Sequence, residues 1–470
     1  MKKHTVRRAG PEAERDFARG VVRVLLLICS LGIPAGGQSA EAKDLAKGKV
    51  GKAIAAWVED AEAKGFRGAI LAARQGRVVA AVGAGFADVE DKVRNTPATL
   101  FEIASFSKQI TAAAAVRLAQ ISDLSIDDPI AKHLTGIPDD CSGITLRHLL
   151  QHTSGIPGSN TQGSGDDLSR VLPGFLQGGP QHEPGTHWEY WNQGYALATE
   201  VIARAAGMPF TAFCEKELFR PAKMKSTGFN GDEAPPRAIV AVGRSKHGAP
   251  RSALEHPYGN SYGFQYRGMG GVVTTVWDLW RWDRALDKSK ILDAASLEEL
   301  FRPGLNDYAL GWFVKRERGR LVQYHTGSVR GFVCEGRRFP DDDACIFVLS
   351  NDDSTQVSTI TTAIEQILFE EPVTVSLASP GDAKEGAFLV GRYTNDQGSE
   401  LSIEIKDDQI RAQVAWKDGN TSRMLIAKDD QGHFAVFVNA DRYDLKISER
   451  TDSQATTIDL WGRTFRRVQD

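Results

Sequence analysis

The sequence predicts a mixed α/β (α+β) fold with a central antiparallel sheet flanked by helices, followed by a second, smaller all-β domain of barrel-like form. Helical and strand-like segments alternate over residues 45–369, whereas residues 386–470 contain only short alternating runs separated by turn signals. The chain also has 470 residues, more than one hydrophobic core usually serves. We therefore expect two folded units, joined by a linker at residues 370–385 that contains Pro, Ser and Gly.

The first element is a predicted signal peptide at residues 1–42, which does not belong to the fold. A basic segment precedes an apolar run at residues 21–33 that only Arg23 interrupts, and Ala40-Glu41-Ala42 offers a cleavage site of the A-x-A type. We expect the protein to be exported, either to the periplasm or out of the cell. The alternative is an uncleaved N-terminal membrane anchor.

Periodicity then predicts the elements of the larger domain in order. Residues 50–64 have a helical pattern, residues 68–82 are typical of a β-hairpin around Gln75-Gly76, and residues 99–119 predict an alanine-rich buried helix. Residues 154–185 are rich in Gly, Ser, Pro and Asp and are expected to form a long loop. Long loops of this kind are usually functional or mobile, so we expect this one to border a site.

The later elements close the sheet of this domain. A helix at residues 194–206 should end at Gly207, because glycine readily adopts the left-handed conformation that ends many helices, and another helix should start near residue 275. The remaining elements are a meander of three strand-like runs and a final helix, at residues 308–315, 332–339, 345–349 and 354–369.

Composition excludes some functions. The formal net charge is −3, and no basic stripe could neutralise phosphates, so we expect no nucleic-acid partner. Beyond the signal peptide the chain has four scattered cysteines, which do not form a disulfide framework. Cys334 and Cys345 flank an acidic turn, but counting outward from the turn places them out of register. We expect all four to be free and buried: Cys141, Cys214, Cys334 and Cys345.

The first candidate for chemistry is Ser105-Phe106-Ser107-Lys108, which opens the alanine-rich helix. Residues three apart share a helix face, so Lys108 can lie over the Ser105 hydroxyl, and a neutral amine could take the hydroxyl proton. The N-terminus of the helix also directs free N–H groups toward whatever Ser105 attacks. The alternative is that Ser105 caps a helix and Lys108 is a solvated surface residue.

The second candidate is Tyr190-Trp191-Asn192, directly before the helix at residues 194–206. A phenol can relay a proton, and an asparagine amide can hold a substrate carbonyl. The alternative is an aromatic packing cluster.

The third candidate is His325-Thr326-Gly327-Ser328, at the start of a strand that precedes Phe332. Here the glycine could admit a substrate backbone close to the strand, the threonine hydroxyl could bind a carboxylate, and the histidine adds a donor or a charge. A lone histidine is more often structural. The order and spacing of all three motifs together favour an active site.

With these motifs the chain resembles the serine β-lactamase-like and penicillin-binding protein family, which includes class C β-lactamases, DD-peptidases, esterases and D-aminopeptidases. The resemblance covers about residues 45–351, and the further matching stretches are residues 149–156, 218–221, 270–275 and 308–312. It implies a β-lactamase/transpeptidase-like fold and a serine hydrolase that needs no cofactor or metal.

The resemblance also implies roles for the motif residues. Ser105 would be the acylated nucleophile, Lys108 its base and Tyr190 a proton relay, while Asn192 would bind a substrate amide. His325 and Thr326 would lie on the carboxylate side, and the backbone N–H groups of Ser105 and Ser328 would form the oxyanion hole. Gly327 completes the substrate-binding strand.

Two departures from the family pattern concern the substrate. Trp191 stands where serine is usual, and its bulk is expected to narrow the site. His325 replaces a lysine, which resembles some DD-peptidases and aminopeptidases more than typical β-lactamases. We therefore expect a DD-peptidase, D-aminopeptidase or esterase-like penicillin-binding enzyme, acting on small molecules or cell-wall peptides. A class C-like β-lactamase and a non-catalytic penicillin-binding sensor are the alternatives.

Two other patterns are less convincing. Residues 259–263 match the G-x-S-x-G elbow of α/β-hydrolases but lack a strand before the serine and a helix after it. His148 and His152 have the spacing of helix-borne metal ligands but no third ligand. For the C-terminal domain the sequence leaves three roles open: shaping the cleft edge, mediating dimers or binding cell wall.

Overall fold

The structure is a computed structural model that describes residues 40–468, apart from 161–166, 246–247, 258–263, 376, 378–385, 407–408, 418–420, 429–433, 439–440 and 452–453. The G-x-S-x-G match and most of the predicted signal peptide thus lie outside the described residues. Of the latter, the turn η1 (Ala40–Ala42) is described. Its Glu41 is held by α10 (Val276–Asp287): the carboxylate pairs with Arg281, and the backbone carbonyl accepts a hydrogen bond from Trp277 Nε1 at 3.0 Å.

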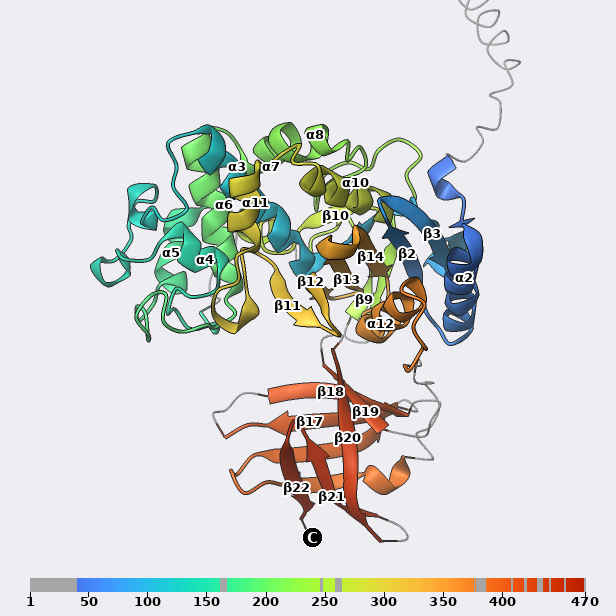
Figure 1. Ribbon diagram of the computed structural model, residues 1–470. Helices are drawn as coiled ribbons and strands as arrows, with labels where there is room; N and C mark the ends of the chain where they lie inside the picture. The colour runs from blue at the N-terminus through green and yellow to red at the C-terminus, as the bar shows by residue number, and fades with distance from the viewer. Residues whose placement is uncertain are drawn as a thin grey trace, which may run out of the picture. The chain divides into compact units, whose positions relative to one another are not determined.

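A seven-stranded antiparallel sheet is the centre of the larger domain (Figure 1). Its strand order is β1-β3-β2-β14-β13-β12-β11. The bounds are β1 (Leu45–Ala46), β2 (Gly68–Arg74), β3 (Arg77–Ala84), β11 (Phe313–Glu317), β12 (Arg320–Val329), β13 (Phe332–Phe339) and β14 (Ala344–Ser350). The predicted hairpin around Gln75-Gly76 is confirmed as β2 and β3, and β2 pairs along its whole length with β14. The sheet thus joins the two ends of the domain's sequence.

The predicted meander has four strands rather than three. The run expected at residues 308–315 begins as a strand only at Phe313, and β12 was not predicted as a whole. A tight turn at Arg318-Gly319, both with positive φ, separates the two strands. This turn lies in a charged stretch whose pattern does not alternate, so periodicity did not reveal the strands beside it.

Helices cover both faces of the sheet because its strands alternate apolar residues toward both sides. In β2, Ile70 and Ala72 pack with α2 (Gly48–Ala63) and α12 (Val357–Leu368), whereas Ala69 and Leu71 pack with the helices of the other face. Those include α3 (Lys108–Ile121), α6 (Asn192–Ala206) and α10. Figure 1 shows α10 and α12 on opposite sides of β13 and β14.

Other elements surround this core. The helices are α4 (Leu146–Leu150), α5 (Leu168–Phe175), α7 (Phe210–Cys214), α8 (Arg220–Ala222), α9 (Phe264–Arg267) and α11 (Ala294–Phe301). The minor strands are β4 (Phe86–Asp88), β5 (Val93–Arg94), β6 (Phe101–Glu102), β7 (Gly228–Phe229), β8 (Val242–Ser245), β9 (Gly248–Ser252) and β10 (Val272–Thr274). The prediction of a long loop over residues 154–185 was wrong where α5 lies, since Leu168, Val171, Leu172 and Phe175 follow helical spacing and are buried.

The predicted helix boundaries hold within a few residues. Gly207 ends α6 with a φ of 64°, as a C-terminal glycine should. Thr275 caps α10 by accepting a hydrogen bond from the Asp278 N–H at 3.1 Å. Among the described residues, no helix combines the length and apolar character needed to span a membrane. The four described cysteines are free and buried, and Cys334 pairs with Leu349 rather than Cys345, so both expectations are confirmed.

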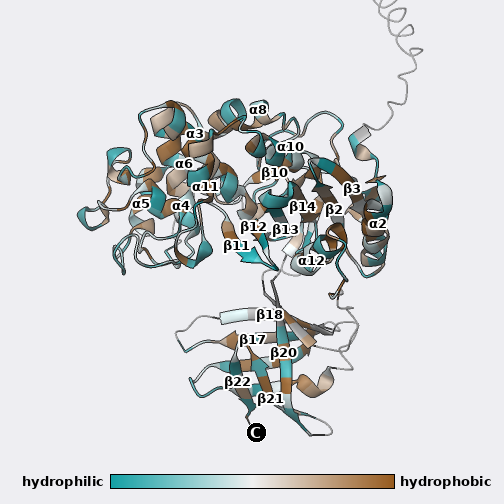
Figure 2. Ribbon diagram, viewed as in Figure 1, coloured by the Kyte–Doolittle hydropathy of each residue, from teal (hydrophilic) through white to brown (hydrophobic). Residues whose placement is uncertain are grey.

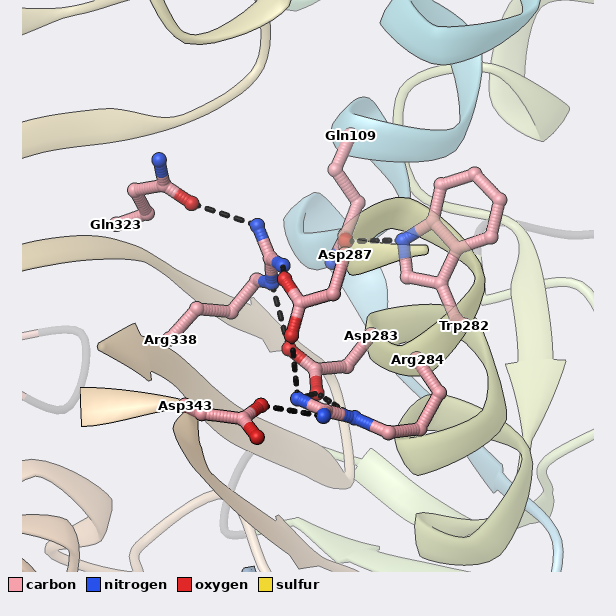
Figure 3. Close-up of polar contacts among 8 residues, drawn as sticks. All are labelled: Gln109, Trp282, Asp283, Arg284, Asp287, Gln323, Arg338 and Asp343. Carbon is pink, nitrogen blue, oxygen red and sulfur yellow. Dashed lines mark hydrogen bonds and ion pairs between the residues drawn. The ribbon is translucent and has the colours of Figure 1, made fainter. Parts of the chain in front are cut away.

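A buried ion-pair cluster attaches α10 to the sheet (Figure 3). Arg338 on β13 donates to Asp283 Oδ1 at 2.7 Å and to Gln323 Oε1 at 2.6 Å, and it also pairs with Asp287. Arg284 joins the same two aspartates. Because the Asp283 side chain is 1% exposed, its charge depends on these arginines.

Residues 391–467 form a closed eight-stranded antiparallel barrel, as predicted. The strands are β15 (Gly391–Thr394), β16 (Glu400–Lys406), β17 (Gln409–Ala415), β18 (Thr421–Lys428), β19 (Phe434–Val438), β20 (Asp441–Arg450), β21 (Ala455–Leu460) and β22 (Arg463–Arg467). Tyr393 pairs with Arg467 and closes the barrel. Alternate residues such as Leu401 and Ile403 fill its core, and Figure 2 shows the alternation of polar and apolar residues along the barrel strands. The domain boundary at residues 370–385 stays a prediction.

Candidate active site

Ser105 lies in a short 3-10 turn, η2 (Ala104–Ser107), that leads directly into α3. The residue before it, Ala104, has a φ of +45°, a left-handed conformation that costs a non-glycine residue about 1–2 kcal/mol. Phe106 fixes the turn from behind, since its ring packs edge-on against Trp312 at 5.8 Å. It also fills the space over Gly336, where a Cβ would lie 2.1 Å from the ring. The turn therefore holds Ser105 at the start of α3 with its side chain partly exposed.

Lys108 lies beneath Ser105 and is fully buried. Its Nζ is 3.1 Å from Ser105 Oγ, 2.8 Å from Asn192 Oδ1 and 2.8 Å from the Met269 carbonyl oxygen. No carboxylate pairs with it among the described residues. Burial alone lowers the pKa of Lys108 well below its usual value, because an ammonium loses its hydration there. The alternative of a solvated surface lysine is wrong.

Tyr190 lies beside the same amine, whose Nζ is 4.9 Å from the tyrosine ring centroid. Although part of the residue is exposed, desolvation raises the pKa of Tyr190 above its ordinary value, and a hydrogen bond with Ser105 opposes that rise. The phenol is therefore protonated at neutral pH. The structure therefore brings Ser105, Lys108 and Tyr190 together.

Asn192 is the first residue of α6, and its Oδ1 faces Lys108. Trp191 points the other way, since neighbouring residues of an extended segment face opposite sides. Its ring is 1% exposed, it packs against Gly194, and its Nε1 donates to the Asn160 carbonyl at 2.9 Å. The expectation that Trp191 narrows the site was therefore wrong, because its bulk lies in the core.

The third motif lies on β12, at the edge of the site. β11 pairs only with Arg320–Tyr324, so from His325 to Val329 the outer edge of β12 has no neighbouring strand among the described residues. A Cβ on Gly327 would lie 2.2 Å from the Ile103 carbonyl oxygen. This glycine thus admits the backbone that carries Ser105, and its expected role beside a substrate stays a prediction. Thr326 is half-buried and Ser328 is exposed along the open edge.

His325 is 2% exposed, and both of its ring nitrogens have protein partners. Nδ1 lies 2.5 Å from the Thr326 carbonyl oxygen, and Nε2 lies 3.1 Å from the hydroxyl of Tyr308. Burial, helped by the nearby Lys108, lowers the pKa of His325 to about 3. The ring is therefore neutral at physiological pH and does not supply the expected charge.

The motif analysis missed His152 as part of this site. Its ring lies 4.2 Å from the Tyr190 ring, centroid to centroid, and its Nδ1 accepts a hydrogen bond from the Trp191 N–H at 3.1 Å. Its spacing from His148 suggested a metal pair, but His148 Nδ1 accepts from the Thr145 N–H at the start of α4. No group of three or more potential metal ligands occurs among the described residues. The signal available was the match of residues 149–156 to the family, not the spacing.

Comparisons with known proteins agree with the fold described above. The family model described as β-lactamase matches residues 54–369. Penicillin-binding protein 4* of Bacillus subtilis (strain 168) is 30% identical over 385 residues, which cover 74% of this chain and 84% of that protein. Two solved structures share the fold. The octameric penicillin-binding protein homologue from Pyrococcus abyssi has a TM-score of 0.62 at 22% identity, over 89% of this chain and 100% of that one. The D-amino acid amidase from Ochrobactrum anthropi SV3, complexed with L-phenylalanine amide, has a TM-score of 0.58 at 22% identity, over 69% and 98%.

Proposed function

The chain belongs to the β-lactamase family, and from this premise we propose that it is a serine hydrolase that cleaves amide or ester bonds through an acyl-enzyme on Ser105. The proposal assigns Lys108 as the base and Tyr190 as the proton relay. Asn192, His325, Thr326, Gly327 and Ser328 would form the substrate-binding side.

The observation that carries the proposal is the set of contacts around Lys108 Nζ. Two of its three partners, Asn192 Oδ1 and the Met269 carbonyl oxygen, can only accept hydrogen bonds. A neutral amine has two hydrogens, and both are used by these acceptors. Its lone pair then faces the third partner, the Ser105 hydroxyl. Burial favours this neutral form, so Lys108 is poised to take the serine proton.

The proposed reaction has two halves. Ser105 Oγ adds to the substrate carbonyl as its proton passes to Lys108. As the bond to the leaving nitrogen or oxygen breaks, Tyr190 gives that atom its proton and receives the serine's proton from Lys108, so both residues return to their starting forms. Water then attacks the acyl ester by the reverse proton path, which releases a carboxylic acid and restores the serine. The N–H groups of Ser105 and Ser328 would bind the oxyanion: Ser105 lies in η2, directly before α3, and Ser328 lies on β12.

The substrate class we propose is that of a DD-peptidase, D-aminopeptidase or esterase-like penicillin-binding enzyme. Two observations support it: the relative named as a penicillin-binding protein, and the fold shared with a protein named D-amino acid amidase. We also propose that the protein works outside the cytoplasm, on the basis of the predicted signal peptide.

The test is intact-mass spectrometry of the protein with a fluorescent penicillin and a p-nitrophenyl ester, following the acyl adduct and its decay. A stable penicillin adduct on Ser105 points to a penicillin-binding peptidase or sensor. Fast turnover of the ester without such an adduct points to an esterase or aminopeptidase. Ser105→Ala should fold and form no adduct, and turnover at the wild-type rate in this variant would refute the assignment.

Ser107→Ala is the matched control within the same motif. Its hydroxyl is buried and accepts a hydrogen bond from the Val272 N–H at 3.0 Å, away from the site. This variant should lose some stability but keep the adduct on Ser105.

A further inference from the structure

A buried carboxylate lies three residues before Ser105 and has no part in the proposed reaction. Glu102, on β6, is 1% exposed and pairs with Arg251, whose side chain is 2% exposed. Its other oxygen accepts a hydrogen bond from the hydroxyl of Tyr266, which is buried on α9. Burial raises the pKa of Glu102 to about 7, while Arg251 and Tyr266 oppose that rise. The charge of this carboxylate therefore depends on its two partners.

Arg251 is itself held by the backbone around it. Its Nε donates to the Arg330 carbonyl at 2.9 Å. Its Nη1 donates to two further carbonyls, that of Ser252 at 3.2 Å and that of Glu255 at 2.9 Å. Because these nitrogens are used in this way, Arg251 holds the Glu102 carboxylate in a fixed orientation.

Tyr266 organises the turn that leads to Lys108. Its carbonyl oxygen accepts hydrogen bonds from three successive N–H groups, those of Met269 at 3.2 Å, Gly270 at 2.9 Å and Gly271 at 3.2 Å. The turn also packs closely on the tyrosine ring, since a Cβ on Gly270 would lie 3.1 Å from it. The Met269 carbonyl in turn accepts a hydrogen bond from Lys108 Nζ at 2.8 Å. The position of Tyr266 thus fixes one of the two acceptors that direct the lone pair of the amine toward the serine hydroxyl.

The turn is tied to its surroundings at two other points. After the turn, β10 pairs with β6, and the Ile103 N–H donates to the Val272 carbonyl at 3.0 Å. Within the turn, the Gly268 carbonyl accepts a hydrogen bond from the Thr111 hydroxyl of α3 at 2.7 Å. The contact made by the Tyr266 hydroxyl is the one that a single substitution removes without changing α3 or the sheet.

We propose that Glu102 and Tyr266 are positioning residues for the base, Lys108. Their hydrogen bond holds the Met269 carbonyl in place, and this carbonyl orients the amine for proton transfer from the serine. The two residues act through the turn rather than on the substrate. The inference rests on the proposed function and adds to it two residues that lie outside the three motifs.

Tyr266→Phe tests the proposal, because it removes the hydroxyl and keeps the ring on which the turn packs. With the p-nitrophenyl ester we expect kcat to fall by about tenfold or more while KM changes less than about threefold, since a misplaced base affects the transition state more than binding. A purely structural role would lower Tm and leave the kcat of the folded enzyme unchanged. That result would overturn the proposal.

Tyr393→Phe is the matched control, from the barrel. Its buried hydroxyl also has a charged partner, since it accepts a hydrogen bond from Arg467 Nη2 at 2.8 Å and donates to the Leu389 carbonyl at 2.7 Å. This variant should lose stability and keep kcat. An equal loss of kcat in Tyr266→Phe and Tyr393→Phe would mean that the effect is not specific to the site, and the proposal would be wrong.

Glu102→Gln tests the other partner of the hydrogen bond. It keeps an oxygen that can accept from Tyr266 but loses the charge that pairs with Arg251, so it should also lower kcat. The double variant of Glu102 and Tyr266 should lose no more than the more affected single variant, because both act through one contact. Losses that add would mean two independent roles and would contradict the proposal.

Hydrogen exchange of the free protein separates failure of the proposal from failure of the proposed function. In Tyr266→Phe the amides of residues 269–271 should exchange about tenfold or more faster than in the wild type. Unchanged exchange would overturn the proposal whatever the ester shows. If exchange rises but the ester never acylates Ser105 in the wild type, the hydrolase assignment fails and the positioning of the amine by the turn stands.

Discussion

Oδ1 of Asn192 lies 2.8 Å from Nζ of Lys108, although the two residues are 84 positions apart in the chain. The contact joins the first turn of α6 to the first turn of α3 and uses one hydrogen of the amine. Because Lys108 has no carboxylate partner within the described structure, this neutral oxygen is one of the few groups that determine its protonation. Changes at Asn192 should therefore be visible in the pH dependence of catalysis.

Asn192→Asp should move the acid limb of the kcat/KM profile to higher pH. A carboxylate at this distance favours the ammonium form and raises the pKa of Lys108, whereas the base must be neutral to act. When the pKa of Lys108 lies above the assay pH, each pH unit between them lowers kcat/KM about tenfold. Asn192→Leu removes the contact without adding charge and is the control. A limb that stays in place in Asn192→Asp would contradict Lys108 as the base.

Lys108→Met should abolish acylation and raise thermal stability at neutral pH. The pKa of Lys108 is lower in the folded chain than in the unfolded chain, so between the two values the unfolded state binds the extra proton. The stability of the wild type should thus rise with pH up to about 10, the ordinary lysine value. Calorimetry of the variant should show a flatter pH dependence, with each kcal/mol worth about 2–4 °C in Tm.

Lys132→Met is the matched control for that experiment. Lys132 is 54% exposed and pairs with Asp128, so its removal should change Tm little and leave the pH dependence above neutral pH unaltered. If Lys108→Met and Lys132→Met changed Tm and its pH dependence equally, the burial of Lys108 would not govern its protonation.

Two substitutions of His152 separate the packing of its ring on Tyr190 from the hydrogen bond that its Nδ1 accepts from the Trp191 N–H. His152→Asn offers Oδ1 to the Trp191 N–H and tolerates the φ of 58°, but it removes the ring that packs on Tyr190. It should fold and lose about tenfold or more in kcat with little change in KM, because a displaced Tyr190 affects the transition state more than binding. A fall in substrate binding with unchanged kcat would argue against this positioning role.

His152→Phe keeps a ring but leaves the buried Trp191 N–H without an acceptor. It should destabilise the domain by about 1–3 kcal/mol. Urea unfolding of both variants checks that His152→Phe is less stable than His152→Asn.

Arg338→Met should destabilise the larger domain by about 3–5 kcal/mol, because it leaves Asp283 buried with less compensation for its charge (Figure 3). Arg302→Met removes an arginine that is 56% exposed and pairs with Glu298 and Glu299, so it should cost at most about 1 kcal/mol. Urea unfolding of the two variants compares a buried with an exposed ion pair. Equal effects would show that the cluster is not a main anchor of α10.

Several features of this protein were readable from the sequence because they depend on neighbours in the chain. The spacing of Ser105 and Lys108 placed both on one helix turn, and the contact between them is found at 3.1 Å. The hairpin signal around Gln75-Gly76, and the glycine that ends α6, identified elements that the structure contains. The resemblance to the family added the roles of the residues in the three motifs.

Only the tertiary structure decided how those motifs act on one another. It turned Trp191 into the core, assigned Gly327 to the Ile103 backbone, placed His152 against Tyr190, and used both nitrogens of His325 within the protein. The physical reason is that periodicity and spacing describe local geometry, whereas desolvation and hydrogen-bond partners come from segments far apart in sequence. The protonation of Lys108 and His325, and with it the chemistry of the site, is set by those distant neighbours.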